Sequence, residues 1–220
     1  MIKKSVIITA GGIGKRMGTE TPKQFLLIKG KPIIMHTIEK FHAFDATMEI
    51  IVILPDSYVP QWESLCQKHL FMIDHKVVSG GEERFHSIQN GLSETSGDII
   101  AIHDAVRPLV GENVIRNCFD TAEKFGAAIP VLAISESLRK IEREKSFAVN
   151  REDFRIVQTP QCFTAEIIRN AYQQHYSKLF TDDASVVEAA GNQIYLVEGN
   201  SENIKITTPQ DLKFVEVFFA

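Results

Sequence analysis

The chain has 220 residues, of which 44% are hydrophobic and 24% are charged, a composition typical of a globular protein and unlike that of a disordered, collagen-like or coiled-coil chain. Its 24 Lys and Arg residues against 28 Asp and Glu residues give a net charge of −4. An anionic ligand therefore has to be bound by a local cluster of cations, and we expect no nucleic-acid partner. All apolar runs are shorter than the roughly 18 residues of a membrane span, so we expect no membrane partner either.

The three cysteines, Cys66, Cys118 and Cys162, are odd in number and widely spaced. They provide neither a disulfide framework nor a Cys-x-x-Cys motif. The apolar stretch near the N-terminus stops at Gly11, too early for the core of a signal peptide. These observations predict a reducing, cytoplasmic location, and the chain length predicts a single domain over residues 1–220.

Short β-branched runs alternate with longer segments of helical period between residues 5 and 133. This alternation predicts βαβ units and an α/β fold with a mostly parallel sheet. The expected strands are 5–9, 49–54, 76–79, 98–102 and 127–133, and the expected helices between them are 32–41, 57–70, 82–92 and 111–125.

Residues 135–158 interrupt the alternation with a segment in which charged side chains crowd around Leu138, Ile141 and Phe147. Such a segment cannot form a core of its own, so it is either a solvated loop or a projecting hairpin. We favour a β-arm. Its apolar residues are candidates for packing on a second subunit, which indicates a homodimer.

Helical patterns return at 164–176, 182–190 and 209–219, with a strand expected at 193–197. The last of these helices has a well-marked start. Thr208 can cap it, Pro209 suits its first position, and Asp211 lies three residues after the cap.

A glycine-rich segment at residues 10–18, Ala-Gly-Gly-Ile-Gly-Lys-Arg-Met-Gly, follows the first expected strand directly. Its glycines allow backbone N–H groups to approach a ligand, and Lys15, Arg16 and nearby Lys23 supply positive charge, which favours a triphosphate cradle. Met17 stands where a dinucleotide-binding fingerprint needs a small residue, and the Gly-Lys-Ser/Thr of a P-loop is missing. The alternative is a structural turn with surface cations.

Residues 103–108 follow the expected strand 98–102 at the carboxyl edge of the sheet, where open α/β sheets bind ligands. Asp104 and Arg107 are three residues apart and suit a Mg²⁺ ion and a phosphate respectively. An Asp–Arg pair that only fixes the turn has the same spacing, so both interpretations stay open.

Three further segments carry candidate binding residues. Gly80 and Gly81 can present backbone groups to a nucleobase edge, unless they only start a helix. Thr181 and the two acids after it open another helix, where an N-cap is the alternative interpretation. Lys205 lies in an apolar, β-like run and needs an anionic partner, either a ligand phosphate or an Asp or Glu.

The seven histidines show no zinc-site spacing and the sequence has no Gly-x-Ser-x-Gly elbow, which leaves phosphate chemistry. Seven motifs then occur in the order found in the 2-C-methyl-D-erythritol 4-phosphate cytidylyltransferases, and the chain resembles that family. The motifs are residues 10–17, 22–24, 80–84, 103–108, 158–161, 181–184 and 203–207.

The resemblance implies a Rossmann-like nucleotidyltransferase fold and a homodimer in which residues 135–158 form the dimerisation arm. It implies transfer of a cytidylyl group from CTP to the sugar-alcohol phosphate 2-C-methyl-D-erythritol 4-phosphate, with release of pyrophosphate. A divalent cation, Mg²⁺, is the implied cofactor.

The resemblance also implies a role for each matching residue. Arg16 and Lys23 would be the catalytic residues that stabilise charge. The residues that would bind CTP are Ala10, Gly11, Gly12, Gly14, Lys15, Gly81, Glu82 and Ser87. The residues that would bind the second substrate are Asp104, Arg107, Ser137, Arg151, Thr181 and Lys205, with Arg151 from the neighbouring subunit's arm and Asp104 also near the metal.

The attacking group in such a reaction is a phosphate monoester that is largely dianionic at neutral pH. No general base is needed, and we expect Arg16, Lys23 and the metal to act as electrostatic catalysts. Two positions depart from the family pattern. Glu136-Ser137 replaces an Asp-Thr pair in the arm, which keeps a hydroxyl but changes the reach of the acid, and Gly11 replaces an alanine found in many members.

Two alternative functions remain open from the sequence. The ribitol 5-phosphate cytidylyltransferases share similar glycine, Pro-Lys-Gln and Thr-Pro-Gln motifs, and a non-catalytic nucleotide-binding protein would keep the same fold. Residues 149–154 and the short C-terminal end favour the methylerythritol enzyme. An NAD-dependent oxidoreductase is disfavoured by Met17.

Overall fold

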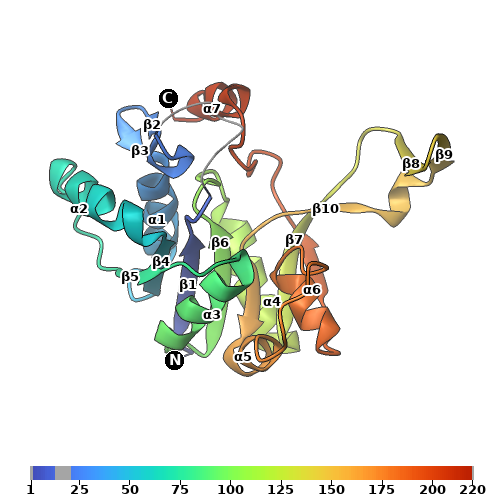
Figure 1. The fold of residues 1–220 in the computed structure, drawn as a ribbon, viewed down its shortest axis with the longest axis horizontal. Coiled ribbons are helices and arrows are strands. Elements are labelled where there is room, and N and C mark those ends of the chain that lie inside the picture. The colour runs from blue at the N-terminus through green and yellow to red at the C-terminus, as the bar shows by residue number, and fades with distance from the viewer. Residues whose placement is uncertain (1, 13–20, 220) are drawn as a thin grey trace.

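The central strand of the sheet is apolar at consecutive positions, as expected for a strand that is covered on both faces. In the computed structural model, which describes residues 2–12 and 21–219, β1 (Lys4–Thr9) pairs in parallel with β4 (Glu49–Leu54) on one side and β6 (Ile99–Asp104) on the other. β5 (Lys76–Ser79) pairs in parallel with β4. The βαβ alternation predicted from the sequence is confirmed here (Figure 1).

The far half of the sheet mixes strand directions. β11 (Gln161–Thr164) lies antiparallel between β6 and β7 (Ala127–Ala133), β10 (Arg155–Val157) is antiparallel to β7, and β12 (Tyr195–Glu198) is parallel to β7. The described part thus contains one eight-stranded, mostly parallel sheet, which confirms the predicted fold class. β10 and β11 were not predicted, because three or four residues are too few to show a period.

Helices cover both faces of the sheet (Figure 1). Val6 and Ile8 of β1 point to one core cluster and Ile7 points to the other, as the strand period requires. The first cluster is covered by α1 (Ile33–Phe44), α2 (Val59–Lys68) and α4 (Glu112–Phe125). The second is covered by α3 (Arg84–Glu94), α5 (Ala165–Ala171) and α6 (Asp183–Ala189).

Residues 135–158 do project from the body of the molecule, as a hairpin rather than a solvated loop (Figure 1). β8 (Leu138–Glu142) and β9 (Lys145–Val149) pair around a two-residue turn in which Arg143 has a φ of +54°. The expected range was too long at its C-terminal end, since residues 155–157 return to the main sheet as β10. The hairpin turn therefore lies far from the sheet, and only its base is anchored there.

A third, smaller core cluster supports the C-terminal segment. Ile28 and Ile33, next to the β2 (Leu27–Ile28) and β3 (Lys31–Pro32) hairpin, pack with Ile206 and with Val215 of α7 (Pro209–Glu216). Residues 203–207 are not a strand, so the β-like expectation for them was wrong. Short 3-10 helices complete the described elements at Lys23–Phe25, Asp56–Tyr58 and Arg151–Asp153. No helix in the described ranges has the length and apolar content to cross a bilayer.

The predicted start of the last helix is confirmed. The Thr208 side chain accepts a hydrogen bond from the Asp211 backbone N–H, and the Asp211 carboxylate accepts one from the Thr208 N–H. This reciprocal capping box fixes α7 directly after residues 203–207.

We expect Thr208→Ala to lower the free energy of unfolding by about 1 kcal/mol, because the helix then loses its N-cap acceptor. Urea unfolding followed by circular dichroism measures the change. Gln210→Ala, an exposed position in the same turn, is the control and should change stability by less than about 0.5 kcal/mol. Equal losses in the two variants would contradict the capping role.

Candidate active site

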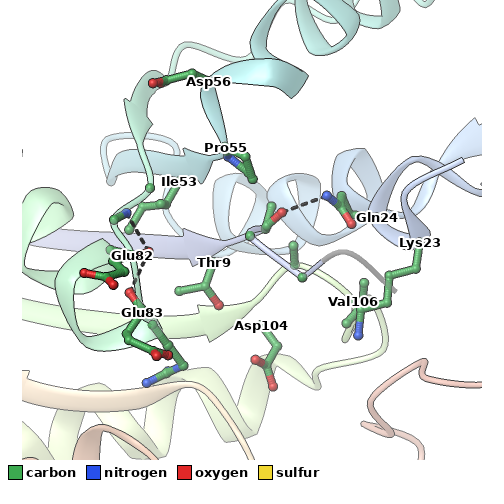
Figure 2. A pocket seen from close by; sticks show the side chains of 18 of the residues that line it. Thr9, Lys23, Gln24, Ile53, Pro55, Asp56, Glu82, Glu83, Asp104 and Val106 are labelled. Atoms are coloured by element: carbon green, nitrogen blue, oxygen red, sulfur yellow. Dashed lines mark hydrogen bonds between the residues drawn. The ribbon is translucent and has the colours of Figure 1, made fainter. Parts of the chain in front are cut away.

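A cavity of about 480 Å³ lies at the carboxyl edge of the four parallel strands β5, β4, β1 and β6. Each strand contributes the residue that directly follows it to the wall, namely Gly80, Pro55, Ala10 and Ala105. In the view of Figure 2, the Glu82–Glu83 turn and Lys23 lie on opposite sides, with Thr9 and Asp104 between them. The cavity is thus where an open α/β sheet binds its ligand.

The start of the glycine-rich segment forms one wall. Ala10, Gly11 and Gly12 line the cavity, and the Ala10 carbonyl accepts a 2.7 Å hydrogen bond from the buried Gln24 side chain. A Cβ atom at position 12 would lie 3.4 Å from the Lys23 Cε atom, an ordinary contact distance, so the Lys23 side chain lies directly beside the loop. The remaining predicted cradle residues, Gly14, Lys15 and Arg16, lie outside the described residues.

The Gly80–Gly81 turn forms the opposite wall, together with Glu82 and Ser87. The Gly81 N–H donates to the Ser87 hydroxyl over 2.9 Å, and that hydroxyl donates to the Glu83 carbonyl over 3.1 Å. A Cβ atom on Gly81 would lie 2.5 Å from the Cβ atom of His86, so the turn requires glycine. Ser87 therefore holds the turn that faces the ligand space.

Asp104 ends β6 at the floor of the cavity and is almost fully buried. Its carboxylate accepts hydrogen bonds from Lys205 Nζ at 3.1 Å and from Arg107 Nε at 2.9 Å. Burial alone raises the pKa of this carboxyl, but Lys205 and Arg107 outweigh burial and hold the pKa well below its usual range. Asp104 is therefore a fixed negative charge among cations.

Arg107 does not line the cavity. It lies behind Asp104 and also donates to the Asn203 carbonyl over 2.7 Å, so it fixes the turn and the segment that carries Lys205. For Arg107, the spacing of Asp104 and Arg107 thus reflects an ion pair that fixes the turn, which is the alternative interpretation given for it above. Lys205 lines the cavity with a side chain that is 43% exposed, and its anionic partner within the chain is Asp104. The expectation that Lys205 is buried in a strand was wrong.

The neutral His103 ring lies beneath this cluster. Its side chain is fully buried, with Nδ1 3.0 Å from the Thr159 hydroxyl and Nε2 3.1 Å from the Arg107 carbonyl. Burial lowers the pKa of His103 to about 4. The Thr159 hydroxyl also accepts the Asp104 N–H at 3.1 Å, so Thr159 connects the two residues.

Besides Arg107, three further predicted residues do not line the cavity of their own chain. Thr181 precedes α6, where its N–H donates to the Ser185 hydroxyl over 3.0 Å. Ser137 and Arg151 lie on the exposed arm, and Arg151 donates to the Ser135 carbonyl at the arm's base. In the described part of one chain, the cavity is thus formed without any arm residue.

Several residues of the site were missed from the sequence. Pro55 and Asp56 line the cavity after β4, and the carboxyl-edge argument used for residue 104 would have found them had it been applied to strand 49–54. Arg84 lines the cavity and was present in a quoted motif without a role. The buried amide of Gln161, which binds the start of α6 through Asp182 and Ala184, was likewise part of a motif, at residues 158–161, without a role.

Glycine turns and cations at the carboxyl edge of a mostly parallel sheet place this chain among the nucleotidyltransferase-like α/β proteins. Its fold is similar to that of 4-diphosphocytidyl-2C-methyl-D-erythritol synthase from Anaerococcus prevotii, with a TM-score of 0.84 and 24% identity over 99% of this chain and 96% of that one. A second solved structure, 2-C-methyl-D-erythritol 4-phosphate cytidylyltransferase from Thermus thermophilus, has a TM-score of 0.79 and 30% identity over 99% and 98% of the two chains.

Curated sequences agree with the structures. The protein named 2-C-methyl-D-erythritol 4-phosphate cytidylyltransferase is 49% identical in Phocaeicola vulgatus, over 98% of this chain and 99% of that protein. The protein of the same name in Bacteroides fragilis is 51% identical over 96% of each. The family described as IspD, 2-C-methyl-D-erythritol 4-phosphate cytidylyltransferase, matches residues 4–220. The chain belongs to this family, which confirms the resemblance found in its motifs.

We expect the stability of the protein to fall as the pH drops from about 6.5 to about 4, partly because of His103. Its pKa in the fold, about 4, is below the ordinary value of 6.5, so the unfolded chain takes up the proton first and the folded state is disfavoured. Urea unfolding across this range measures the loss, to which His103 contributes roughly 3 kcal/mol.

The matched variant is His103→Gln, which keeps hydrogen-bonding groups but cannot titrate. Its stability should fall less over the same pH range than that of the unmodified chain, with His36, whose pKa burial also lowers, accounting for part of the remaining slope. Parallel pH curves for the two proteins would refute the assignment to His103.

Proposed function

We propose that the chain transfers a cytidylyl group from CTP to 2-C-methyl-D-erythritol 4-phosphate and releases pyrophosphate. The observation that carries this proposal is the convergence on one cavity of Gly12, Lys23, Gly81, Asp104 and Lys205, which are spread over almost the whole chain. Membership of the IspD family supports the same activity.

The two walls of the cavity suit the two ends of a nucleotide. The backbone of Gly11 and Gly12 beside Lys23 suits the triphosphate, since N–H groups and an ammonium stabilise phosphate oxygens. The turn at Gly81 and Glu82 offers backbone groups and a carboxylate to a nucleobase edge. Ser87 supports that turn, as its bond to Gly81 indicates, and Lys15 would add charge at the triphosphate.

The acceptor phosphate needs cations that are not neutralised completely by the fold. Lys205 is half exposed to the cavity and shares Asp104 with Arg107, so it can bind a phosphate while Arg107 keeps Asp104 in place. The family resemblance assigns Thr181, just before α6, to the same side, although its side chain does not line the cavity. These assignments place acceptor binding at the end of β6.

The acceptor needs no general base, because a phosphate monoester is already largely dianionic at neutral pH. The barrier lies in bringing two anions together and in stabilising the charge that builds on the α-phosphate oxygens. Lys23, and Arg16 in the segment after Gly12, would act as fixed electrostatic catalysts. Attack in line with the departing pyrophosphate follows from this arrangement.

The donor set at the end of β6 fits a Mg²⁺ ion. Asp104 is a carboxylate that lines the cavity. Its Oδ1 atom accepts a hydrogen bond from Lys205 and its Oδ2 atom accepts one from Arg107, so each oxygen keeps a lone pair for a metal ion. Mg²⁺ is commonly held by one or two carboxylates together with substrate phosphates, so a full protein cage is not required. When bound, the ion would neutralise charge on the triphosphate.

We further propose a homodimer in which each arm reaches the cavity of the other subunit. The arm exposes Ile141, 67% accessible, and Phe147, 48% accessible, as expected for a surface covered by a partner. Arg151 and Ser137 do not reach the cavity of their own chain, and an arm from the second copy would supply them. Residues 1–220 then form one domain, with residues 135–154 of the predicted 135–158 as the dimerisation arm. The three free cysteines support a cytoplasmic location.

A pyrophosphate-release assay with CTP and Mg²⁺ tests the proposed function. Methylerythritol 4-phosphate should be turned over and ribitol 5-phosphate should not, in keeping with the names of the relatives. Preference for ribitol 5-phosphate would contradict the acceptor. CTP binding without turnover of any alcohol phosphate would support the non-catalytic alternative.

Lys23→Ala should reduce turnover by about 10² to 10³, the scale for loss of one preorganised donor at a developing oxyanion. Steady-state pyrophosphate release measures kcat. Lys31→Ala is the matched control, since Lys31 pairs with Glu39 outside the cavity and should keep normal turnover. A folded Lys23→Ala protein with near-normal kcat would refute the catalytic role.

Arg151→Ala and Lys23→Ala subunits should complement each other when mixed. In a heterodimer, the intact arm of the Lys23→Ala subunit would reach the intact cavity of the Arg151→Ala subunit, which restores one of the two sites. Activity of heterodimers purified with two different affinity tags measures this. Heterodimers as inactive as the two parent homodimers would argue against a shared site.

A further inference from the structure

An ion pair between a buried carboxylate and a partly exposed arginine joins the nucleotide wall of the cavity to the start of α6. Arg84, the first residue of α3, lines the cavity. Its Nη1 and Nη2 atoms donate to the two carboxylate oxygens of Asp183 over 2.8 and 2.5 Å. Asp183 is the first residue of α6 and is completely buried. The pair thus connects segments that are 99 residues apart.

The Asp183 end of the pair is bound by Tyr172, which in turn packs on the residue that follows Arg84. The Tyr172 hydroxyl donates to Asp183 over 2.6 Å, and the Tyr172 ring stacks on Phe85 with centroids 4.7 Å apart. Because Phe85 follows Arg84 directly, the start of α3, the end of α5 and the start of α6 form one packed unit. A shift of any one of the three has to move the others.

Stability alone does not account for such a pair. An ion pair with a buried partner is often no more stabilising than well-packed apolar residues, because the buried charge, here that of Asp183, loses its hydration. What a bidentate Arg–carboxylate pair does provide is a fixed orientation in two directions. The geometry is therefore suited to holding two segments in register.

Each end of the pair adjoins a segment of the proposed site. On the nucleotide side, Arg84 follows the Glu82–Glu83 turn that Ser87 holds. On the acceptor side, Asp183 follows Thr181 and Asp182, and the Asp182 carboxylate accepts a 2.8 Å hydrogen bond from the Gln161 side chain. Arg84 and Asp183 are thus placed to transmit a change in either segment to the other.

We propose that Arg84 and Asp183 are positioning residues that couple the nucleotide half of the site to the acceptor half. The inference rests on the proposed function, and it adds that each substrate binds less well when the pair is broken, whichever half carries the substitution. Arg84 sets the turn that faces the nucleobase, and Asp183 sets the segment that carries Thr181.

Two substitutions test the coupling from opposite ends. Asp183→Asn keeps the shape but removes the charge on the acceptor side, and it should raise the KM for CTP by about 5-fold or more. Arg84→Lys removes the bidentate fork on the nucleotide side, and it should raise the KM for the methylerythritol phosphate by a similar factor. Pyrophosphate release at varied concentrations of each substrate gives both values.

Tyr172→Phe is the milder variant in case Asp183→Asn does not fold. It removes only the hydroxyl that binds Asp183 and should raise both KM values in the same direction by a smaller factor. The matched control is Arg169→Lys. Arg169 anchors α5 to the other end of α3 by donating to the Leu92 and Thr95 carbonyls, away from the cavity. The Arg169→Lys substitution should lower the melting temperature and leave both KM values unchanged.

The inference is overturned if the pair variants change the melting temperature as the control does while both KM values stay within about twofold of normal. It is also overturned if each variant affects only the substrate on its own side. Calorimetric titration of CTP alone separates this failure from that of the proposed function. If the unmodified chain binds CTP but releases no pyrophosphate, the function fails, and a weaker CTP affinity in Asp183→Asn would still support the positioning of the nucleotide wall.

Discussion

Asp104 carries a negative charge at the end of a strand that is buried along its whole length, and that charge has to be balanced within the fold. Lys205 and Arg107 balance it from two different segments. Because Lys205 has to reach Asp104, residues 203–207 cross the end of β6. α7 and the third core cluster hold them there. The C-terminal quarter of the chain is thereby brought to the same edge of the sheet as the glycine-rich segment, and the cavity lies between them.

The two glycine turns complete this edge in different ways. At Gly81 the neighbouring His86 leaves no room for a side chain, whereas at Gly12 a Cβ atom would be in ordinary contact with Lys23. The first turn is fixed by Ser87 and the second by the buried Gln24 amide. Polar side chains that hold the backbone therefore determine the shape of the walls, and catalysis by fixed charges depends on that rigidity.

The strands and helix starts that a local sequence pattern marks could be predicted from the sequence. Strand 49–54 has the expected bounds because a continuous apolar, mostly β-branched run marks a buried strand. Strands 76–79 and 127–133 also have the expected bounds, each marked by a short apolar run between helical segments. Thr208 marked a helix start because capping is local. The apolar run at residues 203–207 is β-like in sequence, but its apolar residues are buried by tertiary packing rather than by a sheet. The Arg84–Asp183 pair left no local pattern, since only the topology brings residues 99 positions apart together.

The chain segment that leaves the arm enters the middle of the sheet almost at once. β10 pairs with β7 at the base of the arm, and β11 then lies directly beside β6. Between them, the Thr159 hydroxyl accepts the backbone N–H of Asp104. A displacement of the arm's base is therefore connected to the backbone of Asp104 through a few residues and one hydrogen bond. Insertions in this stretch would be far less tolerable than insertions at the tip.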